Sequence, residues 1–373
     1  MRIGLDGMPL TELKTGIGTY TSELARALAA QAPDDDFELI SPRPFQPAAM
    51  SDAKPANLSL VYAKPNPLQR RWWTFGLPSY VRRTSLDLFH GTNFEVPLRG
   101  NCPTVVTIHD LSLLLHSSTH ATRAVLRGRL RLPRMARRAT LVITVSEPVR
   151  REVCERLRID GDRVFAIPLA PRSGFTAVAP DVALEVRKRL GVEDEFLLFA
   201  GTIEPRKNLI TLVRAFEEVL RTTELRPQLV LAGKIGWKTS DLLTQLERTD
   251  RIKLIGYTPD ADLRALYSSC RAFIYPSVYE GFGLPPLEAM ACGAPVIASA
   301  VPSVNPNVAR VIAPTDVHGL ARNIVELLTD ANARESLSRA GLKHAAQFSW
   351  ERTAKLTREV YDQALKKQTG QLQ

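Results

Sequence analysis

The chain has 373 residues, 45% of them hydrophobic and 24% charged, a composition typical of a globular protein and a length that suits two domains. No run approaches the ~20 apolar residues of a membrane-spanning helix, and the first residues lack the apolar segment of a secretory signal peptide. We therefore expect a cytoplasmic protein. The formal net charge of +10 predicts an anionic partner, which could be nucleic acid, a membrane surface or a phosphorylated substrate.

Apolar runs alternate with amphipathic patterns along the chain, which predicts βα units and parallel sheets. In the first half we expect strands at 2–6, 37–41, 86–90, 104–108, 141–145 and 164–167. A second series is expected at 196–200, 228–232, 252–254, 272–275 and 295–298. The clearest helical patterns lie at 20–30, 148–157, 209–220, 260–268, 284–291, 317–328 and 331–347.

The two series are separated by segment 168–175, which is rich in turn-forming residues and has no periodicity. We place a linker there and predict an α/β protein with two doubly wound, Rossmann-like domains, at 1–170 and 176–350, facing each other across a cleft. A last helix at about 351–373 is expected to pack back on the first domain. Ligands of such sheets bind beyond the carboxyl ends of the strands, where helix N-termini converge.

The four cysteines are far apart in the sequence, with no CxxC pair and no histidine pair nearby. Neither a zinc site nor a disulfide framework is predicted from this spacing. The cysteines are Cys102, Cys154, Cys270 and Cys292.

Two glycines, Gly16 and Gly18, stand before a predicted helix in the first domain. Glycine lets the backbone approach a ligand closely, and a helix N-terminus offers free N–H groups to an anion. The spacing is not a full GxGxxG, so a nicotinamide nucleotide is not indicated. An ordinary turn before a helix is the alternative interpretation.

Arg206 and Lys207 stand between a buried strand and a helix, in the sequence Gly201-Thr202-Ile203-Glu204-Pro205-Arg206-Lys207-Asn208. Two cations beside the positive end of a helix dipole are unfavourable unless an anion binds there. The pair therefore predicts an anion site, with a solvated basic turn as the alternative.

A glycine- and proline-shaped loop precedes the helix predicted at 284–291. Pro285 and Pro286 suit a first helical turn, where a missing N–H costs little, and the helix N-terminus can receive a phosphate. Glu280 and Glu288 flank this point, and a carboxylate can accept two strong hydrogen bonds from sugar hydroxyls. Two exposed acids near a helix start would be the simpler interpretation, but it leaves the loop between them unexplained.

Glu280 and Glu288 are separated by seven residues in an E-G-F-G-L-P-x-L-E context, downstream of the G-T-x-x-P-R-K-N segment. With five further motifs in the same order, the chain resembles the retaining glycosyltransferases of family 4, which have the two-domain GT-B fold. The resemblance covers nearly the whole chain. The further motifs are Gly16-Ile17-Gly18, His109-Asp110, Thr144-Val145-Ser146-Glu147, Leu231-Ala232-Gly233-Lys234 and Ile255-Gly256-Tyr257.

The resemblance implies a metal-independent, retaining hexosyltransferase in which Arg206 and Lys207 neutralise the donor's diphosphate. It implies that Glu280 holds hydroxyls of the transferred sugar, that Glu288 holds the donor ribose, and that His109 lines the sugar pocket. The leaving phosphate would take the acceptor proton, so no protein base is assigned. The remaining implied donor-binding residues are Gly16, Gly18, Phe282, Gly283, Leu284, Gly233 and Lys234.

The opening residues 2–9 and the segment 90–94 look most like bacterial mannosyltransferases of surface-polysaccharide assembly. We therefore expect GDP-mannose as donor and a glycan or polyprenyl-linked saccharide as acceptor, in polysaccharide or lipopolysaccharide assembly. A UDP-hexose or deoxysugar nucleotide, or a sugar-nucleotide epimerase of the same architecture, remains the alternative. The sequence departs from the family pattern at 301–308, a shorter loop that usually lies behind the donor site.

A basic segment at 123–138 contains seven arginines and no acid. Interleaved apolar residues give it the character of a helix that lies on an anionic membrane surface, with a solvated helix as the alternative. We assign Arg127, Arg131 and Arg134 to this surface and add the aromatic pair Trp72 and Trp73, which follows two arginines. Nothing in the chain resembles a nucleic-acid-binding module, so we expect no nucleic-acid partner.

Overall fold

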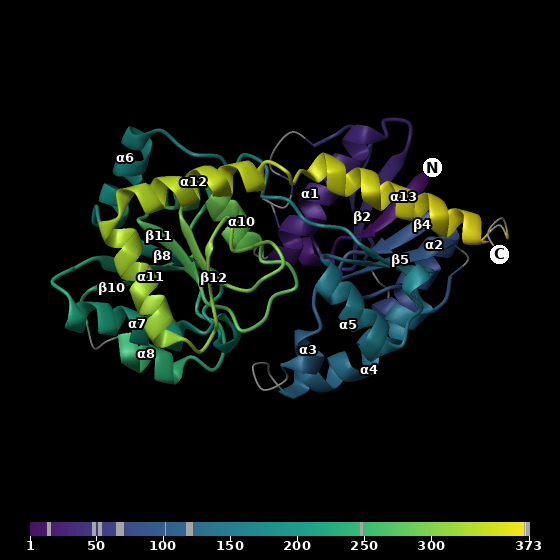
Figure 1. The fold of residues 1–373 in the computed structure, drawn as a ribbon. Coiled ribbons are helices and arrows are strands. Elements are labelled where there is room, and N and C mark those ends of the chain that lie inside the picture. The colour runs from purple at the N-terminus through teal and green to yellow at the C-terminus, as the bar shows by residue number, and fades with distance from the viewer. Residues whose placement is uncertain are drawn as a thin grey trace. The chain divides into compact units, whose positions relative to one another are not determined.

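The computed structural model describes residues 1–12, 16–46, 50, 54–64, 71–100, 102–116, 122–246, 249–368 and 370. The chain divides into two compact units (Figure 1). Unit 1 is built from Met1–Leu115, Thr122–Leu169 and Ser349–Gln373, and unit 2 is centred on Ala170–Phe348.

Unit 1 is organised around a seven-stranded sheet in the order β3-β2-β1-β4-β5-β6-β7. Every neighbouring pair of strands is parallel. The strands are β1 (Arg2–Asp6), β2 (Asp36–Ser41), β3 (Leu58–Tyr62), β4 (Leu88–Gly91), β5 (Thr104–Ile108), β6 (Leu141–Thr144) and β7 (Val164–Ala166).

Helices cover both faces of this sheet because its strands carry apolar side chains on both sides. In β5, Val106 and Ile108 pack into a core with residues of α4 and α5. Thr107 points to the other face and lies 2.8 Å from the hydroxyl of Tyr20 on α1. The helical segments are η1 (Met8–Leu10), α1 (Gly16–Gln31), η3 (Trp72–Gly76), α2 (Leu77–Thr84), α3 (Ser112–Leu115), α4 (Thr122–Arg138), α5 (Glu147–Leu157), η5 (Gly161–Arg163) and α13 (Trp350–Gln368).

The last helix, α13, belongs to unit 1 and lies beside α1 (Figure 1). Gln31 Nε2 donates to the carbonyl oxygen of Glu351 at 2.7 Å, and Thr353 Oγ1 donates to that of Pro168 at 2.8 Å. The buried hydroxyl of Tyr361 lies 2.7 Å from Nδ1 of His90. The end of the chain is thereby fixed to the first sheet.

Unit 2 has a six-stranded parallel sheet in the order β10-β9-β8-β11-β12-β13. The strands are β8 (Phe196–Ala200), β9 (Gln228–Ala232), β10 (Ile252–Gly256), β11 (Ala272–Tyr275), β12 (Val296–Ser299) and β13 (Arg310–Ile312). The helical segments are α6 (Pro180–Leu190), η6 (Pro205–Lys207), α7 (Leu209–Thr222), α8 (Ser240–Leu246), α9 (Asp260–Ser269), α10 (Leu284–Ala291), α11 (Val317–Thr329) and α12 (Ala331–Ala345).

The predicted α/β class with two parallel sheets is therefore confirmed. Two strands were missed, β3 and β13, and both lie at an edge of their sheet. β3 has the sequence LSLVY, in which Ser59 interrupts the apolar residues, and only Leu58 is buried. β13 has only three residues, of which only Ile312 is buried.

Candidate active site

The carboxyl ends of β8 and β9 meet through two glycines. Gly201 and Gly233 have φ angles of 149° and 148°, which few other residues adopt. A Cβ atom on Gly233 would lie 1.9 Å from the carbonyl oxygen of Gly201. Close backbone packing therefore requires glycine at 233. The exposed Lys234 follows it, and its carbonyl oxygen accepts a 3.0 Å hydrogen bond from the backbone N–H of Ile203.

Arg206 and Lys207 lie in the short helical turn η6, directly before α7. Asn208 ends this turn with a φ of 56°. Its side-chain amide donates to the carbonyl oxygens of Pro276 at 3.1 Å and Pro314 at 2.6 Å. The loop after β8 is thus tied to the loop after β11, which carries Glu280.

Arg206, Lys207 and Glu280 form one cluster. Lys207 Nζ lies 2.6 Å from Glu280 Oε1 and donates to the hydroxyl of Tyr275 at 2.6 Å. That hydroxyl donates to the same Oε1 at 3.1 Å. Arg206 Nη1 lies 3.0 Å from Glu280 Oε1, and its Nη2 lies 2.7 Å from Glu204 Oε1. The three residues that the sequence assigned to catalysis in this unit therefore lie together.

The cluster is buried, and the charge of each residue shifts the pKa values of its neighbours. Burial raises the pKa of Glu280, but the positive charges of Lys207 and Arg206 outweigh this effect and bring the pKa to about 2. Burial lowers the pKa of Lys207, and the charge of Glu280 opposes that shift. Glu280 is therefore anionic at neutral pH. Two cations face two carboxylates, of Glu204 and Glu280, so the cluster is formally neutral.

The loop after Glu280 turns sharply into α10. Gly283, the N-cap residue, has a φ of 93°, and two prolines occupy the first turn, as predicted. A Cβ atom on Gly283 would lie 2.7 Å from both Ser303 Oγ and Val301 Cγ2. Phe282 is buried, and its carbonyl oxygen accepts from Ser303 N at 2.9 Å; Leu284 is partly buried. The divergent loop at 301–308 thus supports this turn directly.

Glu288 lies in α10 with only 2% of its side chain exposed. Arg172 donates to both of its carboxylate oxygens at 2.7 Å, from Nε and Nη2. The third nitrogen of that guanidinium, Nη1, lies 2.5 Å from Oδ1 of Asp260. The guanidinium carbon lies 4.1 Å from the ring centroid of Phe175. The carboxylate predicted to hold the donor ribose is therefore already paired with an arginine.

The predicted residues of unit 1 lie at the carboxyl edge of its sheet. Gly16 is exposed and Gly18 buried in the first turn of α1. His109 follows β5, donates from Nε2 to the carbonyl oxygen of Thr92 at 2.8 Å, and packs edge-on against Tyr20, with ring centroids 4.8 Å apart. Burial lowers the pKa of His109 and the bond to Thr92 opposes this, so the imidazole is neutral at pH 7. Its Nδ1 is then an acceptor.

The predicted surface of aromatic and basic residues is partly wrong. Trp72 and Trp73 are 7% and 8% exposed and lie in the core, because the π-helical turn η3 directs both indoles inward. Arg131 is half-buried and pairs with Glu95 at 3.0 Å. Arg134 is exposed, whereas the side chain of Arg127 lies outside the described residues. None of the described helices is both long and apolar enough to cross a membrane.

The sequence also matches known families. Residues 184–344 match the glycosyl transferases group 1 family, and residues 14–170 match Glycosyltransferase Family 4. The O-antigen chain mannosyltransferase B of Escherichia coli is 34% identical over 97% of this chain and 99% of its own length. The chain belongs to glycosyltransferase family 4. It is a glycosyltransferase with the GT-B fold.

A second relative agrees with the family assignment, and two solved structures agree with the fold. The serotype-specific mannosyltransferase WbdA of E. coli is 32% identical over 77% of this chain, which matches 37% of WbdA. Sucrose-phosphate synthase from Thermosynechococcus elongatus has a TM-score of 0.77 at 24% identity, over 97% of this chain and 98% of its own. HepE from Anabaena, in complex with UDP and glucose, has a TM-score of 0.75 at 20% identity, over 97% of this chain and 99% of its own.

Sequence reasoning missed three residues that complete these sites. Glu204 stands inside the motif that drew attention to Arg206, but nothing in its neighbours showed that it would pair with that arginine. Tyr275 was taken as one more apolar residue of a strand. Arg172 lies in the predicted linker, and its partner Glu288 is 116 residues away. The one indication in the sequence was that Arg172 is a charged residue in a segment of turn-forming residues.

Proposed function

We propose that this enzyme transfers mannose from GDP-mannose to a glycan or polyprenyl-linked saccharide, with retention of anomeric configuration and without a metal ion, in bacterial surface-polysaccharide or lipopolysaccharide assembly. The cluster of Arg206, Lys207 and Glu280 carries the proposal for the chemistry. The donor and the process are supported by the two E. coli relatives, which are named mannosyltransferases.

Arg206 and Lys207 neutralise the diphosphate of the donor. In the described structure both cations are paired with carboxylates in a buried site, so their positions are fixed before a ligand binds. Preorganised charges aimed at a developing negative charge need little rearrangement as the bond to the sugar breaks. Because Glu204 and Glu280 balance the two charges, the cations act on the diphosphate through their N–H groups and local fields, where other enzymes use a bound divalent ion.

Glu280 holds hydroxyl groups of the transferred sugar. Its pKa of about 2 keeps it a carboxylate, which can accept hydrogen bonds but cannot act as an acid at neutral pH. His109 lines the sugar pocket as a neutral imidazole with an available Nδ1 acceptor. The proton of the attacking acceptor hydroxyl passes to the leaving phosphate, so these side chains bind and orient the substrates.

Glu288 holds the ribose of the nucleotide. Arg172 donates one hydrogen bond to each carboxylate oxygen of Glu288, so each oxygen keeps a lone pair for a ribose hydroxyl. Arg172 also keeps the carboxylate oriented for these hydroxyls. Backbone N–H groups of Phe282, Gly283 and Leu284 bind phosphate and sugar oxygens at the start of α10. The remaining donor contacts that we propose are Gly16, Gly18, Gly233 and Lys234.

Calorimetry with GDP and UDP, followed by transfer assays with GDP-mannose and UDP-glucose, tests the donor assignment. We expect GDP to bind at least tenfold more tightly than UDP, and mannose to be released or transferred. Tighter UDP binding with turnover of UDP-glucose would replace the proposed donor. Formation of an epimerised sugar nucleotide without acceptor would overturn the proposed reaction.

A polyprenyl-linked acceptor, one of the two that we propose, would be held in a membrane, so we also propose that the enzyme works at the inner face of the cytoplasmic membrane. Two of the surface residues first chosen for this contact, Trp72 and Trp73, are buried in the core. Arg131 is partly neutralised by Glu95. The contact therefore needs another group of residues in unit 1.

A further inference from the structure

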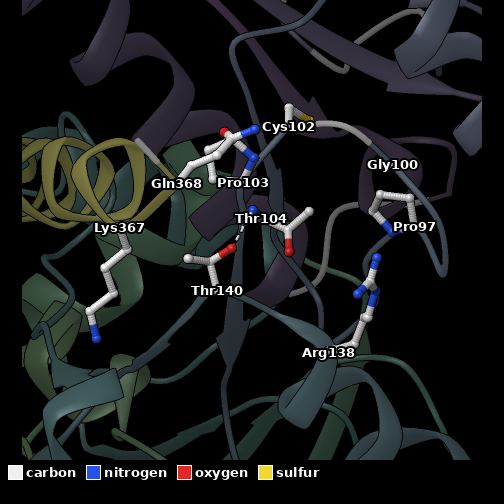
Figure 2. A pocket seen from close by; sticks show the side chains of 9 residues that line it. All are labelled: Pro97, Gly100, Cys102, Pro103, Thr104, Arg138, Thr140, Lys367 and Gln368. Carbon is white, nitrogen blue, oxygen red and sulfur yellow. Dashed lines mark hydrogen bonds between the residues drawn. The ribbon is translucent and has the colours of Figure 1, made fainter. Parts of the chain in front are cut away.

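Two adjoining cavities lie at the amino-terminal edge of the sheet in unit 1. The smaller, about 300 Å³, lies over Thr104, which begins β5, and Thr140, which precedes β6 (Figure 2). Arg138 lines both cavities, and Figure 2 shows it across the smaller one from Lys367. Because β5 runs from Thr104 to Ile108, His109 lies at the opposite edge of the sheet. The cavities are thus distinct from the proposed sugar pocket.

The larger cavity, about 540 Å³, is lined by Phe75, Leu98 and arginines. The loop with Leu98 is fixed to the turn with Phe75, since Leu98 N donates to the carbonyl oxygen of Trp73 at 3.1 Å. Trp72 and Trp73, in the same turn as Phe75, are buried in the hydrophobic core and hold this turn in place. The wall is therefore a formed part of the fold. Its arginines are Arg99, Arg134, Arg137 and Arg138.

Within the part of the chain that the structure describes, none of these arginines is paired with a carboxylate. Among the residues that the structure describes, the guanidinium groups of Arg99, Arg134 and Arg138 make no hydrogen bond or ion pair, and Arg137 donates to the carbonyl oxygen of Leu157 at 3.2 Å. The dipole of α4 favours the cations of its last turn, Arg137 and Arg138. That effect does not account for Arg134, a turn earlier, or for Arg99 on another segment. Cations gathered around one cavity repel each other unless an anion lies between them.

Exposed apolar side chains continue the same surface. Leu126 and Leu130 are 63% and 69% exposed and stand eight and four residues before Arg134, hence along one side of α4. Phe75, on the cavity wall, is 50% exposed. A free phosphate would need the arginines alone, whereas a lipid offers a phosphate to the arginines and an apolar part to these side chains.

We propose that the arginine-lined cavity of unit 1 binds the phosphate of an anionic phospholipid headgroup, with Phe75, Leu126 and Leu130 entering the interfacial layer. Guanidinium groups suit this role because their planar N–H groups match phosphate oxygens in pairs. The inference rests on the proposed membrane location and names its binding site.

Vesicle flotation of the full-length protein tests this site. Vesicles of phosphatidylcholine with 30 mol% phosphatidylglycerol should bind the protein, and pure phosphatidylcholine vesicles should not. Arg134→Gln/Arg138→Gln should lower the partition coefficient by roughly 25-fold, about fivefold for each charge removed near an anionic surface. Arg322→Gln/Arg352→Gln removes the same charge from exposed positions outside the cavity and should change binding less than twofold. Leu126→Ser/Leu130→Ser should remove the part of binding that persists at 0.5 M NaCl.

Calorimetric GDP binding, measured on every variant, separates this inference from the proposed reaction and reports on folding. We expect it to be unchanged. Equal loss of vesicle binding in the Arg322/Arg352 control would overturn the cavity site, since net charge alone would then explain the binding. Binding of inorganic phosphate at the cavity without vesicle binding would overturn the lipid assignment. Loss of GDP binding by Arg206→Ala with vesicle binding intact would show that the two sites are independent.

Discussion

Arg172 donates two parallel hydrogen bonds to Glu288, from Nε to Oε1 and from Nη2 to Oε2, each 2.7 Å long. The side chain of Glu288 is 2% exposed, so its charge depends on this partner for compensation. Burial would lower the pKa of Arg172, but the charge of Glu288 outweighs it and raises the pKa above its ordinary value. The Arg172 guanidinium is therefore charged at neutral pH and faces the buried carboxylate of Glu288.

Removing Arg172 should leave a buried, unpaired carboxylate. We expect Arg172→Ala to lower the free energy of unfolding by about 3 kcal/mol, the scale for breaking a buried ion pair. Arg172→Ala/Glu288→Gln should recover part of that loss because the unpaired charge is gone. Urea denaturation measures both, with Arg339→Ala as the control from an exposed pair, expected to cost at most about 1 kcal/mol. Equal losses in Arg172→Ala and Arg339→Ala would refute a structural role for the pair.

Activity should survive chelation, because Arg206 and Lys207 provide the positive charge for the leaving diphosphate. Transfer rates with and without EDTA should agree within twofold. Of the aspartates with Asp-x-Asp spacing, Asp260 and Asp262 are each paired with an arginine, at 2.5 Å. If EDTA abolishes turnover and manganese restores it, the proposal that Arg206 and Lys207 take the place of a metal ion is wrong.

Acid should remove the contribution of Glu280 to stability. Its pKa is about 2 in the folded protein, below the ordinary value of 4.5, so the ionised carboxylate stabilises the fold above about pH 4.5. That contribution, roughly 3 kcal/mol from the pKa difference, is lost as the pH falls from 4.5 towards 2. Urea denaturation of wild type and Glu280→Gln should differ at pH 7 and converge near pH 2. A difference that does not vary with pH would contradict this pKa.

Much of the fold could be predicted from the sequence because the central strands are buried on both faces. The apolar runs of β8 and β11 gave their bounds directly, since each has every residue buried. The edge strand β3 is short, its apolar residues are interrupted by Ser59, and only Leu58 is buried, so it lacks the continuous buried run of the central strands. The adjacent Trp72 and Trp73 were wrongly predicted to lie on the surface for a related reason. A local sequence does not show whether an aromatic pair beside arginines faces solvent or the core.

The candidate site was predicted only to the level of its chain segments. The loops at Arg206 and Glu280 were recognised because glycines, prolines and charges follow buried strands. Their partners could not be predicted, because Lys207 and Glu280 are 73 residues apart and meet only when β8 and β11 pair in the sheet. Likewise, no local pattern indicates that the divergent segment 301–303 packs under Gly283.

Gly283→Ala should damage both stability and donor binding. The φ of 93° strains any side chain there, and the added Cβ would lie 2.7 Å from Ser303 Oγ and Val301 Cγ2. Gly256→Ala is a matched control, since Gly256 has a φ of 71° but open space around it. We expect about 1–2 kcal/mol for the control, from backbone strain alone, and a larger loss for Gly283→Ala. Thermal unfolding and GDP calorimetry measure the two effects. Equal losses would mean that the contact with segment 301–303 is unimportant.

The charged residues of unit 2 should have different roles in binding and transfer. Arg206→Ala and Lys207→Ala should each reduce turnover by roughly 10²–10³-fold, the scale for preorganised electrostatic groups, and should weaken GDP binding. Glu280→Ala should reduce turnover strongly with GDP affinity almost unchanged, because GDP lacks the sugar that Glu280 holds. Glu288→Ala should weaken GDP binding by about 1.5–3 kcal/mol through loss of a charged hydrogen bond to ribose.

Steady-state transfer and GDP calorimetry on the four variants distinguish these roles, with Glu335→Ala as an exposed control in the same unit. Because Glu288 is also paired with Arg172, each variant is first checked by thermal unfolding, and binding is measured well below its melting temperature. A loss of GDP affinity in Glu280→Ala as large as that in Glu288→Ala would contradict the assignment of sugar to one glutamate and ribose to the other. Unchanged GDP affinity in Lys207→Ala would show that the cluster around Glu280 does not receive the diphosphate, since removing a buried cation there must weaken the binding of an anion.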